Sequence, residues 1–288
     1  MTTGRVIVDR HEAGGVAWEM ARREAPAFLA GSVRGYCGYI ERSALPVRRR
    51  EVPHGGVVLI LSFGDSIDVT TANGGEARPQ RLRSFVAGLH DAPVFTQYEG
   101  CQHGVQVDLT PLGAFRLFGV PAHELANHSV GLDDVRGREI EHLIDRLASA
   151  RAGWSARFDM VDRTLSEWLA DGPDPDRPVA WAWHQLERSN GRVTVADLAD
   201  EIGWSRRHLA GRFREQIGLA PKPTGRVLRF RHAVDLLERA SDQTIADVAA
   251  TAGYADHSHL VRDFRALAGC SPSELVAARM PGGGGVAA

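Results

Sequence analysis

The apolar residues in the first part of the chain are spaced as in β-strands. Val57–Phe63 is apolar and rich in β-branched residues, and it ends at Gly64 and Asp65. Similar short segments follow at 66–71, 84–89, 94–97 and 104–109, with Gly, Asn, Pro and Asp between them. Short strands at this spacing are typical of a barrel or a sandwich. Residues 33–109 are therefore predicted to be mainly strands, with one short helix before them near Trp18–Arg23.

After residue 110 the apolar period becomes helical. Pro111–Phe118 is predicted to be a helix with Thr110 as its N-cap. Two further helices are predicted from apolar residues that share one face, in residues 133–150 and around 158–169: Ile140, Leu143, Ile144 and Leu147, then Phe158, Val161, Leu165, Trp168 and Leu169. These two stripes either cover the β-rich region or form a dimer interface. The Pro- and Asp-rich segment 171–178 cannot continue a helix and is interpreted as a stiff linker.

The last third of the chain contains an internal repeat. Its first copy runs from Thr194 to Trp204, and its second copy from Thr244 to Tyr254. Each copy is followed by a Leu, a Phe, a Gly and a Pro at matching positions: Leu209, Phe213, Gly218 and Pro221, then Leu260, Phe264, Gly269 and Pro272. The offset is 50 residues up to the turn glycine and 51 residues after it. One supersecondary unit is thus present twice.

Each copy has the residues that a helix-turn-helix needs. Thr194 and Thr244 can cap a short first helix. Gly203 and Gly253 allow the backbone of a tight turn between helices. The Leu and Phe that follow, four residues apart, can pack the second helix onto the first. A helical bundle with two αα-hairpins is the structural alternative, and the four arginines on one predicted recognition helix argue against it.

This pattern resembles the AraC/XylS family of bacterial regulators. The resemblance covers Pro178–Arg279 and is most specific in Asp247–Arg265 with Gly269–Pro272. It implies a DNA-binding module with two helix-turn-helix units joined by a long helix, here Thr224–Arg239. The sequence departs from the family at Ala210 and Gly211, where members often carry a polar or basic residue.

Two N-terminal segments, 53–60 and 108–121, resemble a sensor domain that precedes such modules in GC-rich bacteria. Related sensors are cupin-like β barrels that bind small molecules and dimerise through helices, so the resemblance implies an α+β fold. The expected order is a β-rich sensor domain (1–132), a helical cover or dimerisation segment (133–172), a linker (173–178), the DNA-binding domain (179–280) and a disordered Gly-rich tail (281–288).

The two predicted recognition helices supply the candidate DNA contacts. The first should run from Arg206 to about Gln216 behind Ser205, and the second should begin after Asp256. Arg207 is the best candidate for a bidentate guanine contact. The candidate base-contacting residues are Arg206, Arg207, Ala210, Gly211, His257, Ser258 and Arg262; the candidate phosphate contacts are Arg212, Arg214, Arg226, Arg229 and Arg265. Arg206 could equally hold a phosphate, and any single surface arginine can be simply solvated.

Charge and cysteine content fit this interpretation. The formal net charge of −2 divides into 15 Arg or Lys against 12 Asp or Glu in residues 177–279, and 19 against 24 in residues 1–176. A basic DNA-facing module behind an acidic domain is expected to show this asymmetry. The three cysteines, Cys37, Cys101 and Cys270, form no CxxC pair. With no apolar run or leader pattern either, the expected location is the bacterial cytoplasm, on the nucleoid and away from membranes.

An enzyme is the alternative to a regulator. His54, His90, His103 and Cys101 could be imagined as a metal site in a β barrel, but their spacing matches no compact ligand motif. The alternative function is therefore a cupin-type metal-dependent enzyme with an appended DNA-binding region. The preferred function is an effector-responsive transcriptional activator without catalytic activity, metal or cofactor. Its expected partners are a double-stranded DNA operator, RNA polymerase, a small-molecule effector and a second copy of the chain.

Overall fold

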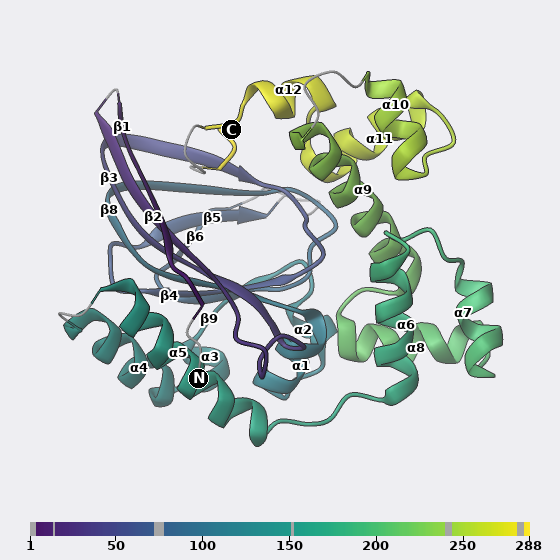
Figure 1. Cartoon of the computed structure of the whole chain (residues 1–288), viewed down its shortest axis with the longest axis horizontal. Coiled ribbons are helices and arrows are strands. Elements are labelled where there is room, and N and C mark those ends of the chain that lie inside the picture. The colour runs from purple at the N-terminus through teal and green to yellow at the C-terminus, as the bar shows by residue number, and fades with distance from the viewer. Residues whose placement is uncertain (1–3, 14, 72–77, 151–152, 240–243, 281–284) are drawn as a thin grey trace.

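The structure is a computed structural model that describes residues 4–13, 15–71, 78–150, 153–239, 244–280 and 285–288. A β-rich N-terminal part is followed by helices only, which gives the α+β class expected from the sequence. In Figure 1 the sheet and its covering helices form one body, and the C-terminal helices lie along one side of it.

The described strands form one antiparallel sheet. They are β1 (Ile7–Ala13), β2 (Val16–Glu24), β3 (Val33–Glu51), β4 (Val57–Ser62), β5 (Ile67–Thr71), β6 (Gln80–Leu82), β7 (Phe85–Ala87), β8 (Val94–Leu109) and β9 (Ser129–Gly131). The main path is β1-β2-β3-β8-β4-β7-β9, and β5 adds to the first half of β8. Strands β1 and β9 stand at the two ends of this path, so the hydrogen bonding among the described strands does not close into a barrel.

Alternating side chains give the sheet two different faces. In β4, Leu59 and Leu61 belong to a core with helices on its other side, whereas Val58 and Ile60 face a cavity. The helices of this core are α1 (Pro111–Phe118), α4 (Arg138–Ser149) and α5 (Trp154–Ala170), with short α2 (Ala122–Leu125) and α3 (Asp133–Arg136) beside them. The two apolar stripes seen in the sequence are thus buried within one chain, and they provide no argument for a dimer.

Three local predictions were wrong. Residues 18–23 form part of strand β2, because they pair with β1 on one side and with β3 on the other. The predicted helix 133–150 is broken at Gly137, which has φ 56° and ψ −140° and separates α3 from α4. The predicted strands 94–97 and 104–109 are one strand, since the residues between them also pair with β3. In each case long-range pairing or a single glycine overrides the local pattern.

The C-terminal part is built from seven described helices around two cores. They are α6 (Arg177–Arg188), α7 (Val195–Ile202), α8 (Arg206–Ile217), α9 (Pro221–Arg239), α10 (Ile245–Ala252), α11 (His257–Ala268) and α12 (Pro272–Ala277). The expected connecting helix is α9. It contributes Leu228 to the first core and Val227, Phe230 and Val234 to the second. The linker ends at Asp176, two residues earlier than expected, because Pro178 fits the first turn of α6.

The tail prediction was wrong for the residues that the structure describes. The backbone N–H of Arg50 donates to Val286 at 2.9 Å, and that of Ala287 donates to Ala278 at 2.7 Å. Gly285–Ala288 therefore lies between strand β3 and the end of α12, because β3 offers backbone groups there for pairing. The rest of the predicted tail, residues 281–284, lies outside the described residues.

Candidate nucleic-acid interface

The first unit is held by its caps and its turn. Thr194 and Asp197 form a reciprocal capping box at the start of α7. Gly203 ends that helix with φ 75°, which only glycine adopts without strain. Ser205 then accepts from the backbone N–H of His208 and begins α8. The caps Thr194 and Ser205 and the turn at Gly203 are those expected from the sequence, and they fix where the recognition helix begins.

The second unit repeats this geometry. Thr244 and Asp247 form the capping box of α10, and Gly253 ends the helix with φ 82°. The carboxylate of Asp256 accepts from the backbone N–H of His259 at 2.7 Å, at the start of α11. Leu260 is fully buried in the second core, as Leu209 is in the first. The fold of the repeat is therefore the double helix-turn-helix expected from the sequence.

Each recognition helix has one buried face and one exposed face. On α8, Leu209 and Phe213 are fully buried, while Arg206 and Arg207 are exposed in the first turn. The other candidate base contacts at this helix are Gly211, which is exposed, and Ala210, which is half-buried; Arg214 is exposed. On α11, His257, Ser258, Arg262 and Arg265 are all exposed. The predicted contact residues thus share the outward faces of two helices.

Three of the five arginines predicted to contact phosphates already have partners within the chain. Arg212 lies half-exposed between Asp176 and Glu215, with N–O distances of 2.8 and 2.6 Å. Nε of Arg226 lies 2.8 Å from Asp263, and Nη2 of Arg229 donates to the carbonyl of Gly191 at 3.2 Å. A phosphate would have to compete with these groups. Arg214 and Arg265 are exposed and better placed for phosphate contact.

The first unit does not stand alone. Its core includes Leu89, Leu112 and Ala126 from the N-terminal part, packed with residues of α6 and α8. The backbone N–H of Asp176 also donates to the side-chain oxygen of Gln216 at 2.8 Å. The two parts of the chain therefore share a hydrophobic interface at the first unit, and no local pattern in the sequence predicts this interface.

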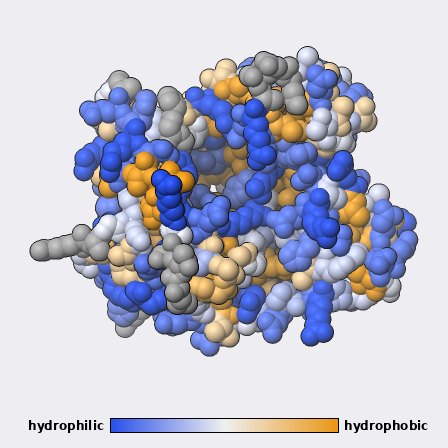
Figure 2. All heavy atoms as spheres, viewed as in Figure 1, coloured by the Kyte–Doolittle hydropathy of each residue, from blue (hydrophilic) through white to orange (hydrophobic). Residues whose placement is uncertain are grey.

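A cavity of about 1020 Å³ lies on the open face of the sheet, where it meets the connecting helix α9. Figure 2 shows the molecule hollowed between the β-rich part and the C-terminal helices, with mostly hydrophilic residues around the opening. Side chains of the sheet line it, and so does Arg231 of α9. This volume is at the upper end of what small-molecule sites occupy.

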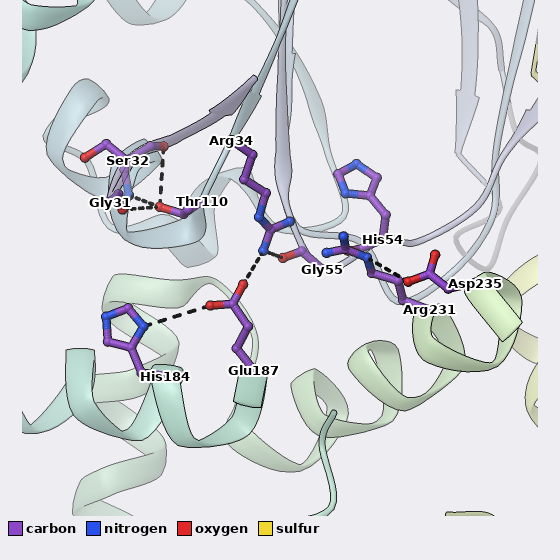
Figure 3. A network of polar contacts seen from close by, with 11 residues as sticks. Gly31, Ser32, Arg34, His54, Gly55, Thr110, His184, Glu187, Arg231 and Asp235 are labelled. Carbon is purple, nitrogen blue, oxygen red and sulfur yellow. Dashed lines mark hydrogen bonds and ion pairs between the residues drawn. The ribbon is translucent and has the colours of Figure 1, made fainter. Parts of the chain in front are cut away.

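Polar contacts tie the edge of this cavity to the C-terminal helices. Nη2 of Arg34 on β3 donates to Gly55 at 3.2 Å and pairs with Glu187 of α6 at 2.8 Å. Nη1 of Arg231 donates to the carbonyl of His54 at 3.2 Å. In Figure 3 the imidazole of His54 points away from α9, while its backbone faces Arg231. Sequence reasoning missed Arg34 and Arg231, because partners so far apart in the chain leave no local pattern.

The residues of the imagined metal site are not brought together. His54 and His90 line the cavity, whereas the ring of His103 packs against Phe63 and Trp154 on the other face of the sheet. Burial and nearby arginines lower the pKa of both His54 and His103 to about 4. Among the described residues, no three His, Cys, Asp or Glu side chains are grouped so that they could hold a metal ion.

No helix in the described part of the chain is long and apolar enough to cross a membrane.

Comparison with known proteins agrees with this geometry. Residues 198–278 match the family described as a helix-turn-helix domain, and residues 22–131 match a domain of unknown function (DUF6597). An AraC-like transcription regulator of Streptomyces lividans is 37% identical over 118 residues, which is 41% of this chain and 38% of that protein. The transcriptional activator RhaR of Pectobacterium carotovorum is 33% identical over 107 residues, which is 34% of this chain and 37% of that protein.

Among solved structures, ToxT from Vibrio cholerae aligns with a TM-score of 0.46 and 12% identity, covering 83% of this chain and 96% of that one. A likeness of this size carries no functional conclusion. The chain spans less than two fifths of the length of the two curated relatives described above.

Two capped helix pairs, each turning at a left-handed glycine, define a double helix-turn-helix module. The match to the helix-turn-helix family and the similarity to AraC-like regulators support the resemblance to the AraC/XylS family that the sequence of the C-terminal region implied.

Proposed function

We propose that this chain is a sequence-specific DNA-binding transcription regulator that responds to a small-molecule effector and activates transcription. The observation that best supports this proposal is that both recognition helices expose polar side chains in their first turns. Arg206 and Arg207 are exposed in the first turn of α8, and His257 and Ser258 in the first turn of α11. Arginine at such a position can bind guanine edges, and flanking arginines can hold phosphates.

The connecting helix supports a single asymmetric operator. Helix α9 contributes side chains to both cores, so the two units are joined by one rigid element. Each recognition helix would enter a major groove, with the two grooves about 34 Å apart along one face of the DNA. A fixed connection of this kind selects DNA with that spacing, or bends the DNA to reach it.

The remaining parts of the proposal concern domains and partners. The β-rich part with its cavity is the proposed sensor, and residues 179–280 are the proposed DNA-binding domain. Activation would require contact with RNA polymerase, and two copies of the chain would bind as a homodimer. The relatives' own names support regulation, because they are described as a transcription regulator and a transcriptional activator.

The experiment uses the full chain, because Leu89, Leu112 and Ala126 complete the first core. Selection from random or genomic DNA, followed by titration at two salt concentrations, should recover a defined sequence whose affinity falls steeply as salt rises. A double variant, Arg206→Ala with Arg207→Ala, should lose selectivity at the base positions that α8 contacts. Arg163→Ala, which removes an exposed arginine on α5, is the matched control and should behave as the wild type. Failure to enrich any sequence would contradict the proposal.

A further inference from the structure

The cavity has an apolar side and a polar side. Its apolar side is formed by a cluster on β4, β5 and β7 in which Ile60, Val69 and Phe85 are buried. Another part of the lining, the polar wall, carries polar and charged side chains of β3 and β8, among them Glu41, Arg49 and Tyr98. A ligand of this cavity therefore needs an apolar body with polar atoms at defined places.

The charged groups of the polar wall already satisfy one another. Nη1 of Arg49 lies 2.9 Å from Oε1 of Glu41, and the hydroxyl of Tyr98 donates to Oε2 of Glu41 at 2.5 Å. Glu51 accepts from the hydroxyl of Thr96 at 3.1 Å, and burial raises the pKa of this carboxyl. Because the charges of Glu41 and Arg49 compensate each other, this part of the wall does not call for a charged ligand.

Four buried polar atoms of lining residues have no partner among the described residues. Two are the Nε atoms of Arg23 and Arg49, whose guanidinium groups are already ion-paired within the chain. The other two are Nε2 of His90 and Oγ of Ser129, in residues that are 9% and 7% exposed. Nδ1 of His90 lies 2.6 Å from the carbonyl of Gly88, and a carbonyl only accepts, so Nδ1 carries the proton and Nε2 is an acceptor. Burial lowers the pKa of His90, which keeps this ring neutral.

The strand register places these two residues on neighbouring segments of the chain. Ser129 pairs with Ala87 on β7, and His90 follows three residues after Ala87. Buried polar atoms are nearly always hydrogen-bonded in folded proteins, so an acceptor and a hydroxyl left open in a cavity lining mark a place for a ligand. A hydroxyl group, which both donates and accepts, can satisfy the two atoms together.

We propose that the cavity binds an uncharged small molecule with an apolar body and a hydroxyl group, which donates to Nε2 of His90 and accepts from Oγ of Ser129. As the effector site this deepens, and rests on, the proposed DNA-binding function. The site itself is defined by the cavity and by these two unpartnered atoms.

The loop between β3 and β4 links this site to the DNA-binding module. His54 places its imidazole in the cavity lining, while its carbonyl accepts from Arg231 of α9. The carbonyl of Gly55 accepts from Arg34, which pairs with Glu187 of α6. Val52 packs against the core of the second unit. A ligand that shifts residues 52–56 therefore acts on the connecting helix and on both units.

Binding is tested by calorimetry on the full chain with three probes of one shape. They are 2-naphthol, 2-methylnaphthalene, which lacks the hydroxyl, and 2-naphthoate, which is an anion. We expect 2-naphthol to bind at one site, at least about tenfold more tightly than the other two probes. Loss of one buried hydrogen bond lowers the affinity by about this factor or more. His90→Phe and Ser129→Ala should each weaken 2-naphthol about tenfold. His103→Phe is the matched control, because its Nε2 is also buried and unpartnered but faces away from the cavity.

Three results would overturn the site. They are equal binding of 2-naphthol and 2-methylnaphthalene, unchanged affinity in both variants, and tighter binding of 2-naphthoate that is lost in Arg231→Leu. The last result would show an anion site at the domain boundary instead. Absence of binding by all three probes would overturn it as well.

The link to DNA is tested by operator affinity with and without saturating 2-naphthol. The wild-type affinity should change by roughly threefold or more, within the usual range of allosteric coupling. At probe concentrations that calorimetry shows to saturate each variant, Arg231→Leu should lose this response, whereas Arg239→Leu, at the exposed end of the same helix, should keep it. An equal response in Arg231→Leu would overturn the link. If the full chain bound no DNA, the proposed function would fail, while the calorimetry would still decide the site.

Discussion

Nε of Arg226, on the connecting helix, lies 2.8 Å from Oδ1 of Asp263 on the second recognition helix. The Asp263 side chain is only 7% exposed, whereas that of Arg226 is 42% exposed. The ion pair therefore links α11 to α9, with its carboxylate buried and its guanidinium partly exposed. An arginine used in this way is a poor candidate for the phosphate contact that its sequence position suggested.

Arg226→Ala should lower the free energy of unfolding by about 1–3 kcal/mol, because it leaves a buried carboxylate without its cation. Urea unfolding of the full chain measures this change. Arg265→Ala is the matched control, since Arg265 is exposed on α11 itself. It should leave stability unchanged and reduce the salt dependence of DNA binding by about one phosphate contact. A stable Arg226→Ala protein with reduced salt dependence would restore the phosphate role.

Local signals in the sequence were enough to predict the DNA-binding module. Thr194, Thr244, Ser205 and Asp256 all cap the helices that they were expected to cap. Capping depends on residues within one turn, so a linear pattern records it. The contact residues at DNA stay a prediction, because exposure alone does not separate base from phosphate contacts.

The domain boundary and the cavity could not be predicted in this way. Arg231 and His54 meet across 177 residues of chain, and their contact depends on how two folded parts pack. The prediction of a helix around Trp18 was wrong for the same reason. This segment is a strand because it pairs with β1 and β3, and the local sequence does not record that pairing. Even the apolar stripe of α4 left open whether it covers the sheet or another copy, and only the fold shows that Ile140 is buried within the chain.

Stability should fall as the pH drops from about 6.5 to about 4. Burial, Arg34 and Arg231 lower the pKa of His54 to about 4, against the opposing effect of Asp108. In this window the unfolded chain binds a proton that the folded chain refuses, so acid favours unfolding. One such histidine changes the free energy of unfolding by at most about 1.4 kcal/mol per pH unit. Unfolding curves at several pH values should show a smaller slope for His54→Gln. The same reduction in His123→Gln, which removes an exposed imidazole, would contradict the assignment.

Gly55→Ala should weaken the contact between the β3–β4 loop and the connecting helix. Gly55 has φ 73°, and a Cβ there would lie 2.7 Å from Cδ2 of Leu228 on α9. The left-handed backbone alone costs an alanine about 1–2 kcal/mol, and the contact adds to this cost. Gly211→Ala is the control, and it should have the opposite effect. Gly211 lies inside helix α8 with open space around it, so alanine there should raise the free energy of unfolding by about 0.5–1 kcal/mol. Thermal unfolding of both variants measures the difference, and equal shifts in one direction would count against this account.

The two recognition helices should divide the work of reading DNA unequally. Arg207 is exposed at the start of α8, but the next turn offers only Ala210 and Gly211, whose side chains cannot hydrogen-bond a base. Helix α11 presents His257, Ser258 and Arg262 over two turns. Arg207→Ala should therefore cost about 1–3 kcal/mol and relax one base position, whereas Arg214→Ala should weaken all sequences alike and reduce the salt slope by about one contact. Selections on randomised operators with both variants separate these effects. An unchanged selected sequence with Arg207→Ala, together with an altered one with Arg214→Ala, would reverse the two roles.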